Sequence, residues 1–160
     1  MQINFYPLFP QFFDPHVILT ADQQAESKCT ADYLSGLPLA CCAWESYDLA
    51  MEFMTKTTER SILKARLLEV FMLWLFCVRI KPLSTVDAQD MAAFMEFYQT
   101  PPADWTRKRS LCQRFVDCPN SGKAVNPDWR PTSKPKPKAL QSMRWVLRAF
   151  GEFLSKGALM

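Results

Sequence analysis

Three features of the sequence predict an all-α protein with four main helices. Residues 57–80 carry aliphatic side chains at helical spacing, followed by an unbroken apolar run over residues 70–78. A helix that is amphipathic at one end and apolar all round at the other is buried at that far end, with neighbours on every side. No pair of alternating segments joined by a turn is present. The 4 glycines against 12 prolines disfavour both a β-sandwich and a glycine-rich phosphate loop.

Residues 1–40 are predicted to be an N-terminal extension of a domain that covers residues 41–160. Between Phe5 and Phe13, prolines interrupt a run of aromatic residues that has neither a helical nor a strand period. We expect a strap packed over the core, and the alternative is a recognition arm. Residues 22–34 have the pattern of a short helix, closed by the glycine and proline that follow.

The first two core helices are predicted over residues 42–55 and 57–80. Thr57 or Thr58 is expected to cap the second of them, because a hydroxyl accepts from the free amides of the first turn. Pro82 ends it by excluding helical geometry from the preceding residue. Its apolar run is shorter than the roughly 20 residues that a membrane span needs, so we expect a core helix.

A third helix is predicted within residues 83–99. Ser84 or Thr85 is expected to be its N-cap, with Asp87 three residues after Ser84 as in a capping box. The prolines at positions 101 and 102 stop it.

Residues 101–137 are predicted to form a long basic loop before the last helix. A short helix over residues 109–116 is expected within it, and Trp105 and Trp129 are expected to be exposed. Loops of this length in a compact domain are usually functional or disordered. The last helix is predicted over residues 138–156, with its apolar residues on one face.

The charge is unevenly distributed along the chain. Lys28 is the one basic residue among residues 1–55, and all other lysines and arginines lie from Lys56 onward. The first 55 residues contain seven acids: Asp14, Asp22, Glu26, Asp32, Glu45, Asp48 and Glu52. This asymmetry suggests a polyanion as the partner of the C-terminal two thirds.

No residue set in the sequence predicts catalysis, a metal site or a cofactor. His16 is the one histidine, and nothing places a nucleophile beside it. Cys112 and Cys118 do not have the spacing of a zinc-binding pair. The N-terminus has no basic, apolar signal sequence, so we expect reduced thiols and a cytoplasmic location.

The basic residues instead predict a DNA-binding surface. They lie on the first half of the second core helix, in the long loop, and at the start of the last helix, and residues 105–114 and 129–148 contain almost no acids. A merely solvated face usually mixes both signs of charge. Basic extended segments and the first turns of helices are the elements that contact phosphates and base edges.

Three sequence motifs resemble the tyrosine recombinases, the phage-integrase family. The first is FMLWLFCVRIKPLSTVDAQDMAAFMEFYQTPPADW, which is similar to a segment of the N-terminal core-binding domain of that family. The second is NPDWRP at residues 126–131, which is similar to the element before the last core-binding helix in one bacterial subgroup. The ending FLSKGAL is also similar, and the resemblance covers about residues 43–160. The matching positions of the first motif are Phe71, Trp74, Leu75, Lys81, Pro82, Leu83, Ser84, Asp87 and Asp90.

The resemblance implies a SAM-like four-helix bundle that grips double-stranded DNA as one half of a clamp. The family's Arg–Lys–His–Arg–His–Tyr catalytic set has no counterpart in this sequence, so we expect no enzyme activity from this chain. The chain also departs from the family at the start of the long helix, where Arg60 and Lys64 replace a Thr/Tyr-rich segment, and at Ala158, where the family has tyrosine.

The resemblance further implies that residues 58–66 and 136–148 face the major groove. The expected base-edge contacts are Arg60, Lys64, Lys136, Lys138, Gln141, Arg144 and Arg148. The expected phosphate contacts are Arg107, Lys108, Arg109 and Lys134. Part of the apolar helix surface is expected to meet other protomers in a recombination synapse.

Two other functions compete with DNA binding. A helical protein-interaction domain would use the aromatic N-terminus, and it predicts loss of binding when Phe12 or Phe13 is replaced. A thiol enzyme would use Cys41 or Cys42, and it requires a lowered thiol pKa.

Overall fold

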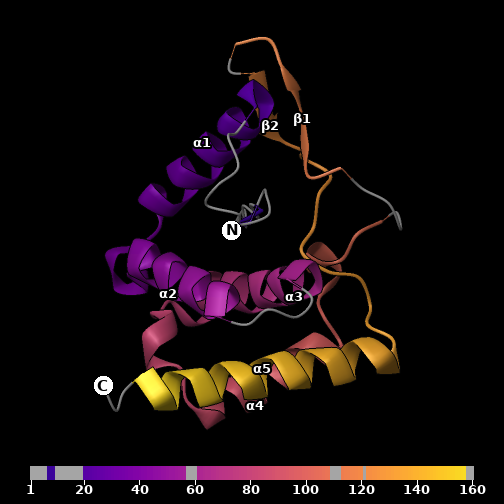
Figure 1. The fold of residues 1–160 in the computed structure, drawn as a ribbon. Helices are drawn as coiled ribbons and strands as arrows, with labels where there is room; N and C mark the ends of the chain where they lie inside the picture. The colour runs from indigo at the N-terminus through magenta and orange to yellow at the C-terminus, as the bar shows by residue number, and fades with distance from the viewer. Residues whose placement is uncertain (1–6, 10–19, 57–60, 109–112, 121, 158–160) are drawn as a thin grey trace.

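The computed structural model describes residues 7–9, 20–56, 61–108, 113–120 and 122–157, and it is mostly helical (Figure 1). Its α-helices are α1 (Ala21–Gly36), α2 (Ala43–Lys56), α3 (Ser61–Trp74), α4 (Ala88–Gln99) and α5 (Pro137–Gly157). The short helical turns are η1 (Leu39–Cys41), η2 (Leu75–Arg79), η3 (Leu83–Thr85) and η4 (Ala103–Trp105). The strands are β1 (Phe115–Cys118) and β2 (Gly122–Val125). The predicted helical character is confirmed, with a small sheet added to it.

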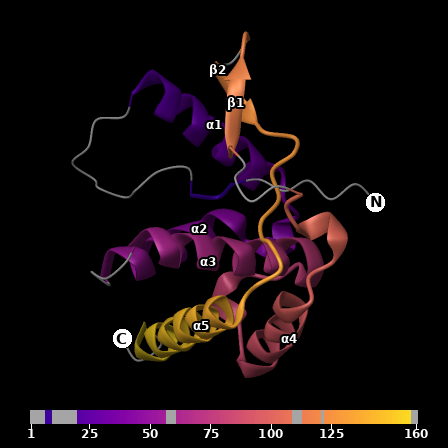
Figure 2. The same ribbon diagram turned by 90° about the vertical axis from the view of Figure 1, so that its right-hand side faces the viewer.

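The helices form two layers and a separate upper unit. Helices α2 and α3 lie together above α4 and α5 in both views, and α3 packs on α5 (Figures 1 and 2). Helix α1 packs against β2 and reaches α2 at its lower end. Among the described helices, none has an apolar stretch long enough to cross a membrane.

The core surrounds α3, as its apolar run predicts. Phe71 and Trp74 of α3 pack edge-on against Phe94 of α4, with ring centroids 4.9 and 5.4 Å away. On the α5 side, Phe53 of α2 meets Phe150 edge-on at 5.2 Å. Because α4 and α5 reach the same central helices with aromatic rings, one cluster of buried side chains joins both layers.

The end of the long helix differs from the prediction. After Trp74 the chain widens into the π-helical turn η2, and Ile80 then adopts a left-handed conformation with φ 54°. The amide of Ile80 donates to the carbonyl of Leu75 at 2.6 Å, which closes the helix. Left-handed geometry is unusual for a β-branched residue. Val78, the last residue of the apolar run, is exposed although the run predicts burial, and Ile80 is exposed as well.

The predicted cap of the third core helix is wrong. Ser84 and Thr85 lie in η3, and Asp87 is the N-cap of α4. The Asp87 side chain accepts from the Asp90 amide at 2.9 Å, and the Asp90 carboxylate accepts from the Asp87 amide at 3.1 Å. The capping box is real but starts three residues later than predicted, because η3 occupies the residues between Pro82 and the helix.

The prediction of a short helix over residues 109–116 is also wrong for residues 113–116, the part of this range that the structure describes. Phe115 and Val116 belong to β1, which pairs antiparallel with β2. The hairpin depends on tertiary packing: Gly122, with φ +84°, comes so close to Ala25 of α1 that an added Cβ would lie 3.4 Å from the alanine Cβ. Contact with α1 decides the conformation of a segment that has little preference of its own.

The strap predicted for the N-terminus is confirmed for residues 7–9, where Leu8 and Phe9 are fully buried. Trp105 and Trp129 are also buried, contrary to the prediction that they are exposed. The caps expected at Thr57 or Thr58 lie outside the described residues.

Candidate nucleic-acid interface

Helix α5 has one buried face and one basic face. Its start follows from sequence, because Pro137 supplies a pre-set φ at the first helical position and has no amide left unpaired. Met143, Val146, Leu147 and Phe150 recur at helical spacing and are buried. The side chains at intervening positions therefore point outward.

The outward side of α5 and the segment before it carry five exposed cations. These residues, which we call the α5 basic face, are Lys134, Lys136, Lys138, Arg144 and Arg148. None of them forms an ion pair with a residue that the structure describes. Gln141 is exposed among them. From Lys138 to Arg148 the face extends about 15 Å along the helix axis. Five of the eleven predicted contacts thus lie together on one surface, with Gln141 as a sixth.

Lys108 extends this surface from a neighbouring segment. Thr106 and Thr132 form a parallel bridge, and the Arg107 amide donates to the Thr132 carbonyl at 2.9 Å. Lys108 and Lys134 each lie two residues beyond this bridge, and both are exposed. The loop therefore brings a sixth cation to the start of the α5 basic face.

Arg107 does not lie free as predicted for a phosphate contact. Its Nε donates to the Arg130 carbonyl at 3.1 Å, and its Nη2 donates to the Pro131 carbonyl at 3.3 Å. The half-buried guanidinium thus fastens residues 130–131, in the segment that leads to α5.

Lys64 is buried, not exposed as predicted for a contact in the major groove. Its residue surface is only 2% exposed, and its Nζ lies 5.4 Å from the ring centroid of Phe53 and 5.8 Å from that of Trp145. The cause is the position of α3 between α2 and α5, which leaves little of its first half to solvent. Arg60 and Arg109, also predicted as contacts, lie outside the described residues.

Two further arginines are used inside the protein, around the buried carboxylate of Glu69. Arg114 donates from Nη1 to Glu69 Oε1 at 2.8 Å and from Nη2 to Oε2. The amides of Leu8 and Phe9 donate to the same Oε2 at 2.7 and 3.1 Å. Arg66 donates to the Phe9 carbonyl at 2.9 Å. Burial, and then the charge of Arg114, lower the pKa of Arg66.

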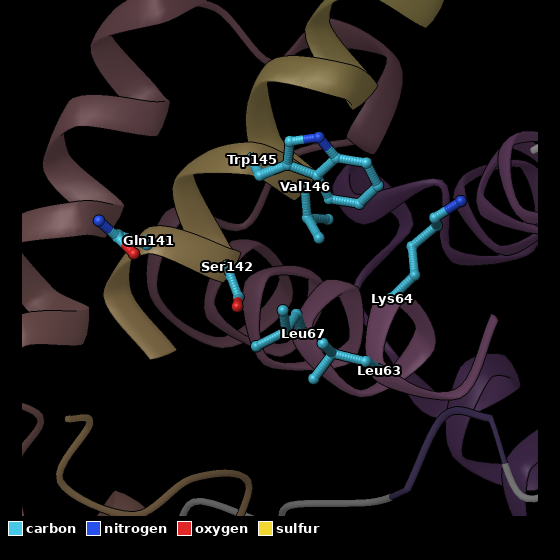
Figure 3. A pocket seen from close by; sticks show the side chains of 7 residues that line it. All are labelled: Leu63, Lys64, Leu67, Gln141, Ser142, Trp145 and Val146. Atoms are coloured by element: carbon cyan, nitrogen blue, oxygen red, sulfur yellow. The ribbon is translucent and has the colours of Figure 1, made fainter. Parts of the chain in front are cut away.

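A pocket of about 370 Å³ opens between α3 and α5 (Figure 3). Leu63, Lys64 and Leu67 line it from α3, and Gln141, Ser142, Trp145 and Val146 line it from α5. A second hollow of about 410 Å³ shares Leu63 and Ser142 with the pocket and is lined by Tyr98, Lys134, Pro135, Lys136, Lys138, Ala139 and Ser133. The two hollows are therefore adjacent parts of one groove.

Trp145 and Leu63 are two exposed hydrophobic groove residues that the sequence-based prediction missed. Trp145 is 51% exposed, although it belongs to an amphipathic helix with a well-filled apolar face. Its position, four residues after Gln141 and three before Arg148, is the signal that places it on the basic face.

The structure gives no support to a catalytic thiol at Cys41. Burial raises the pKa of the Cys41 thiol, and the neighbouring Cys77 and Cys42 raise it further, which is the opposite of what a nucleophile needs. Among the described residues, no group of three or more His, Cys, Asp or Glu side chains could hold a metal ion. His16 and Cys112 lie outside those residues.

No protein-family model, curated protein or solved structure matches this chain. The choice of function therefore depends on the residues and contacts of this chain itself.

Proposed function

We propose that this chain is the DNA-binding, core-binding module of a site-specific integrase of the tyrosine-recombinase type, built on a SAM-like bundle. It grips the recombination site in the bacterial nucleoid, and strand cleavage requires a catalytic domain that supplies the active-site tyrosine. The observation that carries the proposal is the α5 basic face, whose five cations have no ion-pair partner among the described residues.

The geometry of this face suits a DNA duplex. An α-helix fits the major groove, where Arg pairs with guanine and Gln with adenine through two hydrogen bonds. Gln141, Arg144 and Arg148 recur at spacings of three and four residues, so they lie along one side of α5. Lys134, Lys136 and Lys138 flank the helix start, where the helix dipole also favours phosphate.

The residues that carry the family resemblance have structural roles that support the proposal. Phe71, Trp74 and Leu75 are buried at the centre of the bundle. Lys81 donates to Asp90 at 2.5 Å and so joins the turn after the long helix to the start of α4. A motif whose members hold the bundle together is consistent with an inherited fold.

The test is fluorescence anisotropy of a labelled, fully paired, mixed-sequence duplex over a salt series. We expect wild-type affinity to fall steeply with salt, because each phosphate contact releases counterions. The Lys136→Glu/Lys138→Glu variant should lose about tenfold or more in affinity and should have a shallower salt dependence.

The matched control is Lys28→Glu/Lys56→Glu, which changes the net charge equally at exposed positions outside the α5 basic face. It should bind much more tightly than the α5 variant. Equal losses in both variants would show attraction by net charge alone, and absence of wild-type binding at low salt would refute the proposal.

A second candidate function, a helical protein-interaction domain, is favoured by an apolar surface around η1 and η2. Leu39 is 96% exposed, and Val78 and Ile80 are also exposed. The two segments adjoin, since the Cys41 thiol donates to the Phe76 carbonyl at 3.6 Å. If a second protomer covers this surface, light scattering should show self-association that Leu39→Glu abolishes. Phe12 and Phe13, predicted for this function, lie outside the described residues.

A further inference from the structure

The pocket between α3 and α5 has the walls of a site for a flat, heteroaromatic group. Leu63, Leu67 and Val146 are apolar, and the half-exposed indole of Trp145 offers a planar surface (Figure 3). Gln141 brings an amide, which both donates and accepts hydrogen bonds. The volume of the pocket, about 370 Å³, lies at the small end of the range for pockets that bind organic ligands.

The pocket lies on the same side of α5 as the basic face. Gln141 and Trp145 belong both to the pocket wall and to the row that contains Arg144 and Arg148. The adjoining hollow is lined by Lys134, Lys136 and Lys138, all of them exposed. A basic groove combined with an aromatic platform is the arrangement by which proteins hold unpaired nucleotides.

A paired base cannot enter such a pocket. Within a duplex, each base is stacked on its neighbours and presents only its edges to the grooves. A base reaches a protein pocket and stacks on an aromatic side chain only after it leaves the duplex, and this is easiest where it has no pairing partner.

We propose that the α3–α5 pocket binds an unpaired nucleobase of DNA, stacked on Trp145, while Lys134, Lys136 and Lys138 hold the adjacent phosphates. This inference rests on the proposed function and names the form of DNA that the site prefers, which is a duplex with an extrahelical base.

Lys64 lines the pocket from α3, beside Trp145. Its ammonium lies within cation–π distance of both Phe53 and Trp145, so it helps to fix the position of the indole.

The experiment compares two duplexes of the same sequence, one fully paired and one with a single extrahelical 2-aminopurine. Anisotropy gives the affinity for each, and the fluorescence of the 2-aminopurine reports stacking. We expect the wild-type chain to bind the bulged duplex about tenfold more tightly and to quench its 2-aminopurine.

The variants locate the effect on one side chain. Trp145→Ala should remove the preference and the quenching, so that it binds the bulged and the paired duplex equally, and Trp145→Phe should keep part of both. Trp44→Ala is the control, because Trp44 is 45% exposed on α2 outside the pocket. It should bind both duplexes as the wild type does.

The outcomes separate this inference from the proposed function. Equal wild-type affinity for both duplexes, with 2-aminopurine left bright, overturns the pocket proposal and leaves duplex binding standing. Preference and quenching that persist in Trp145→Ala place the base elsewhere and also overturn it. No binding of either duplex at low salt overturns both proposals. If Trp145→Ala does not fold, Trp145→Phe and wild-type quenching still decide.

Discussion

Two groups of basic residues in this chain have opposite roles. Arg66, Arg107 and Arg114 point into the protein and hydrogen-bond a carboxylate or backbone carbonyls. The cations of the α5 basic face point outward and have no ion-pair partner among the described residues. The two groups look alike in the sequence, so a basic stretch indicates an external partner only where the fold leaves its charges unpaired.

Glu69 accounts for the inward direction of Arg114. A buried carboxylate needs hydrogen bonds and an opposite charge, and Glu69 obtains both from Arg114 and from the amides of Leu8 and Phe9. The same interaction ties the N-terminal strap and the long loop to α3. No acid lies between Asp128 and Glu152, and Glu152, four residues after Arg148 on α5, is exposed rather than buried like Glu69.

The largest expected effect comes from removing the buried Glu69 carboxylate that pairs with the inward-pointing Arg114. Glu69→Ala should lower the free energy of unfolding by about 3–5 kcal/mol, because it leaves the guanidinium of Arg114 without its countercharge and two amides without an acceptor. Denaturant unfolding measures this change. Glu96→Ala, at an exposed position of α4, is the control and should change stability by less than about 0.5 kcal/mol. A similar small effect in both variants would refute the structural role of Glu69.

Asp90 forms a second ion-pair cluster, with Lys81 and Arg79, and its replacement should have the next largest effect. Asp90→Asn should lower stability near neutral pH by about 2 kcal/mol, since it removes the charge that pairs with Lys81. Partial burial raises the pKa of Asp90, but hydrogen bonds from Lys81 and the Asp87 amide outweigh it and lower the pKa below 3.8.

The pH dependence of stability follows from the lowered pKa of Asp90. The stabilisation by Asp90 should be complete well above pH 3.8 and should be lost as the pH falls through the lowered folded-state pKa. Unfolding of wild type and Asp90→Asn as a function of pH measures it. The two proteins should converge in acid, and a difference that stays constant would rule out an ionised Asp90 as its source.

Replacement of Lys64 tests whether a buried lysine next to the α5 basic face contributes to duplex binding. Lys64→Met should leave the affinity for a fully paired duplex within about twofold, because the lysine is buried, and should change stability by about 1 kcal/mol. Anisotropy and thermal unfolding measure the two quantities. A tenfold loss of duplex affinity in a folded variant would return Lys64 to the DNA-contacting group.

The smallest effect is expected from replacing a single cation of the α5 basic face. Lys134→Ala should weaken duplex binding about two- to threefold and should reduce the salt slope by about one, with stability changed by less than about 0.5 kcal/mol. The salt series of the binding assay gives the slope. An unchanged slope would remove Lys134 from the phosphate contacts.

The sequence by itself determines the helices and the buried stripe of each. The period of apolar residues places α2 and α5 within one residue of their observed bounds, because burial of one helix face is a local pattern. It also predicts α3 and α4, although α3 ends six residues earlier and α4 begins five residues later than predicted. The outward direction of the cations on α5 follows from the same pattern, since they occupy positions that the buried stripe leaves open.

Only the tertiary structure decides what the other basic and aromatic residues do. Lys64 is buried because α3 lies between two helices, and Trp105 and Trp129 are buried because the long loop folds back onto the core. Phe115 and Val116 are predicted to be helical from the sequence, but they belong to the hairpin. The hairpin forms because α1 packs against it. Each of these outcomes depends on a contact between residues far apart in the chain, and no local period of side chains reports such a contact.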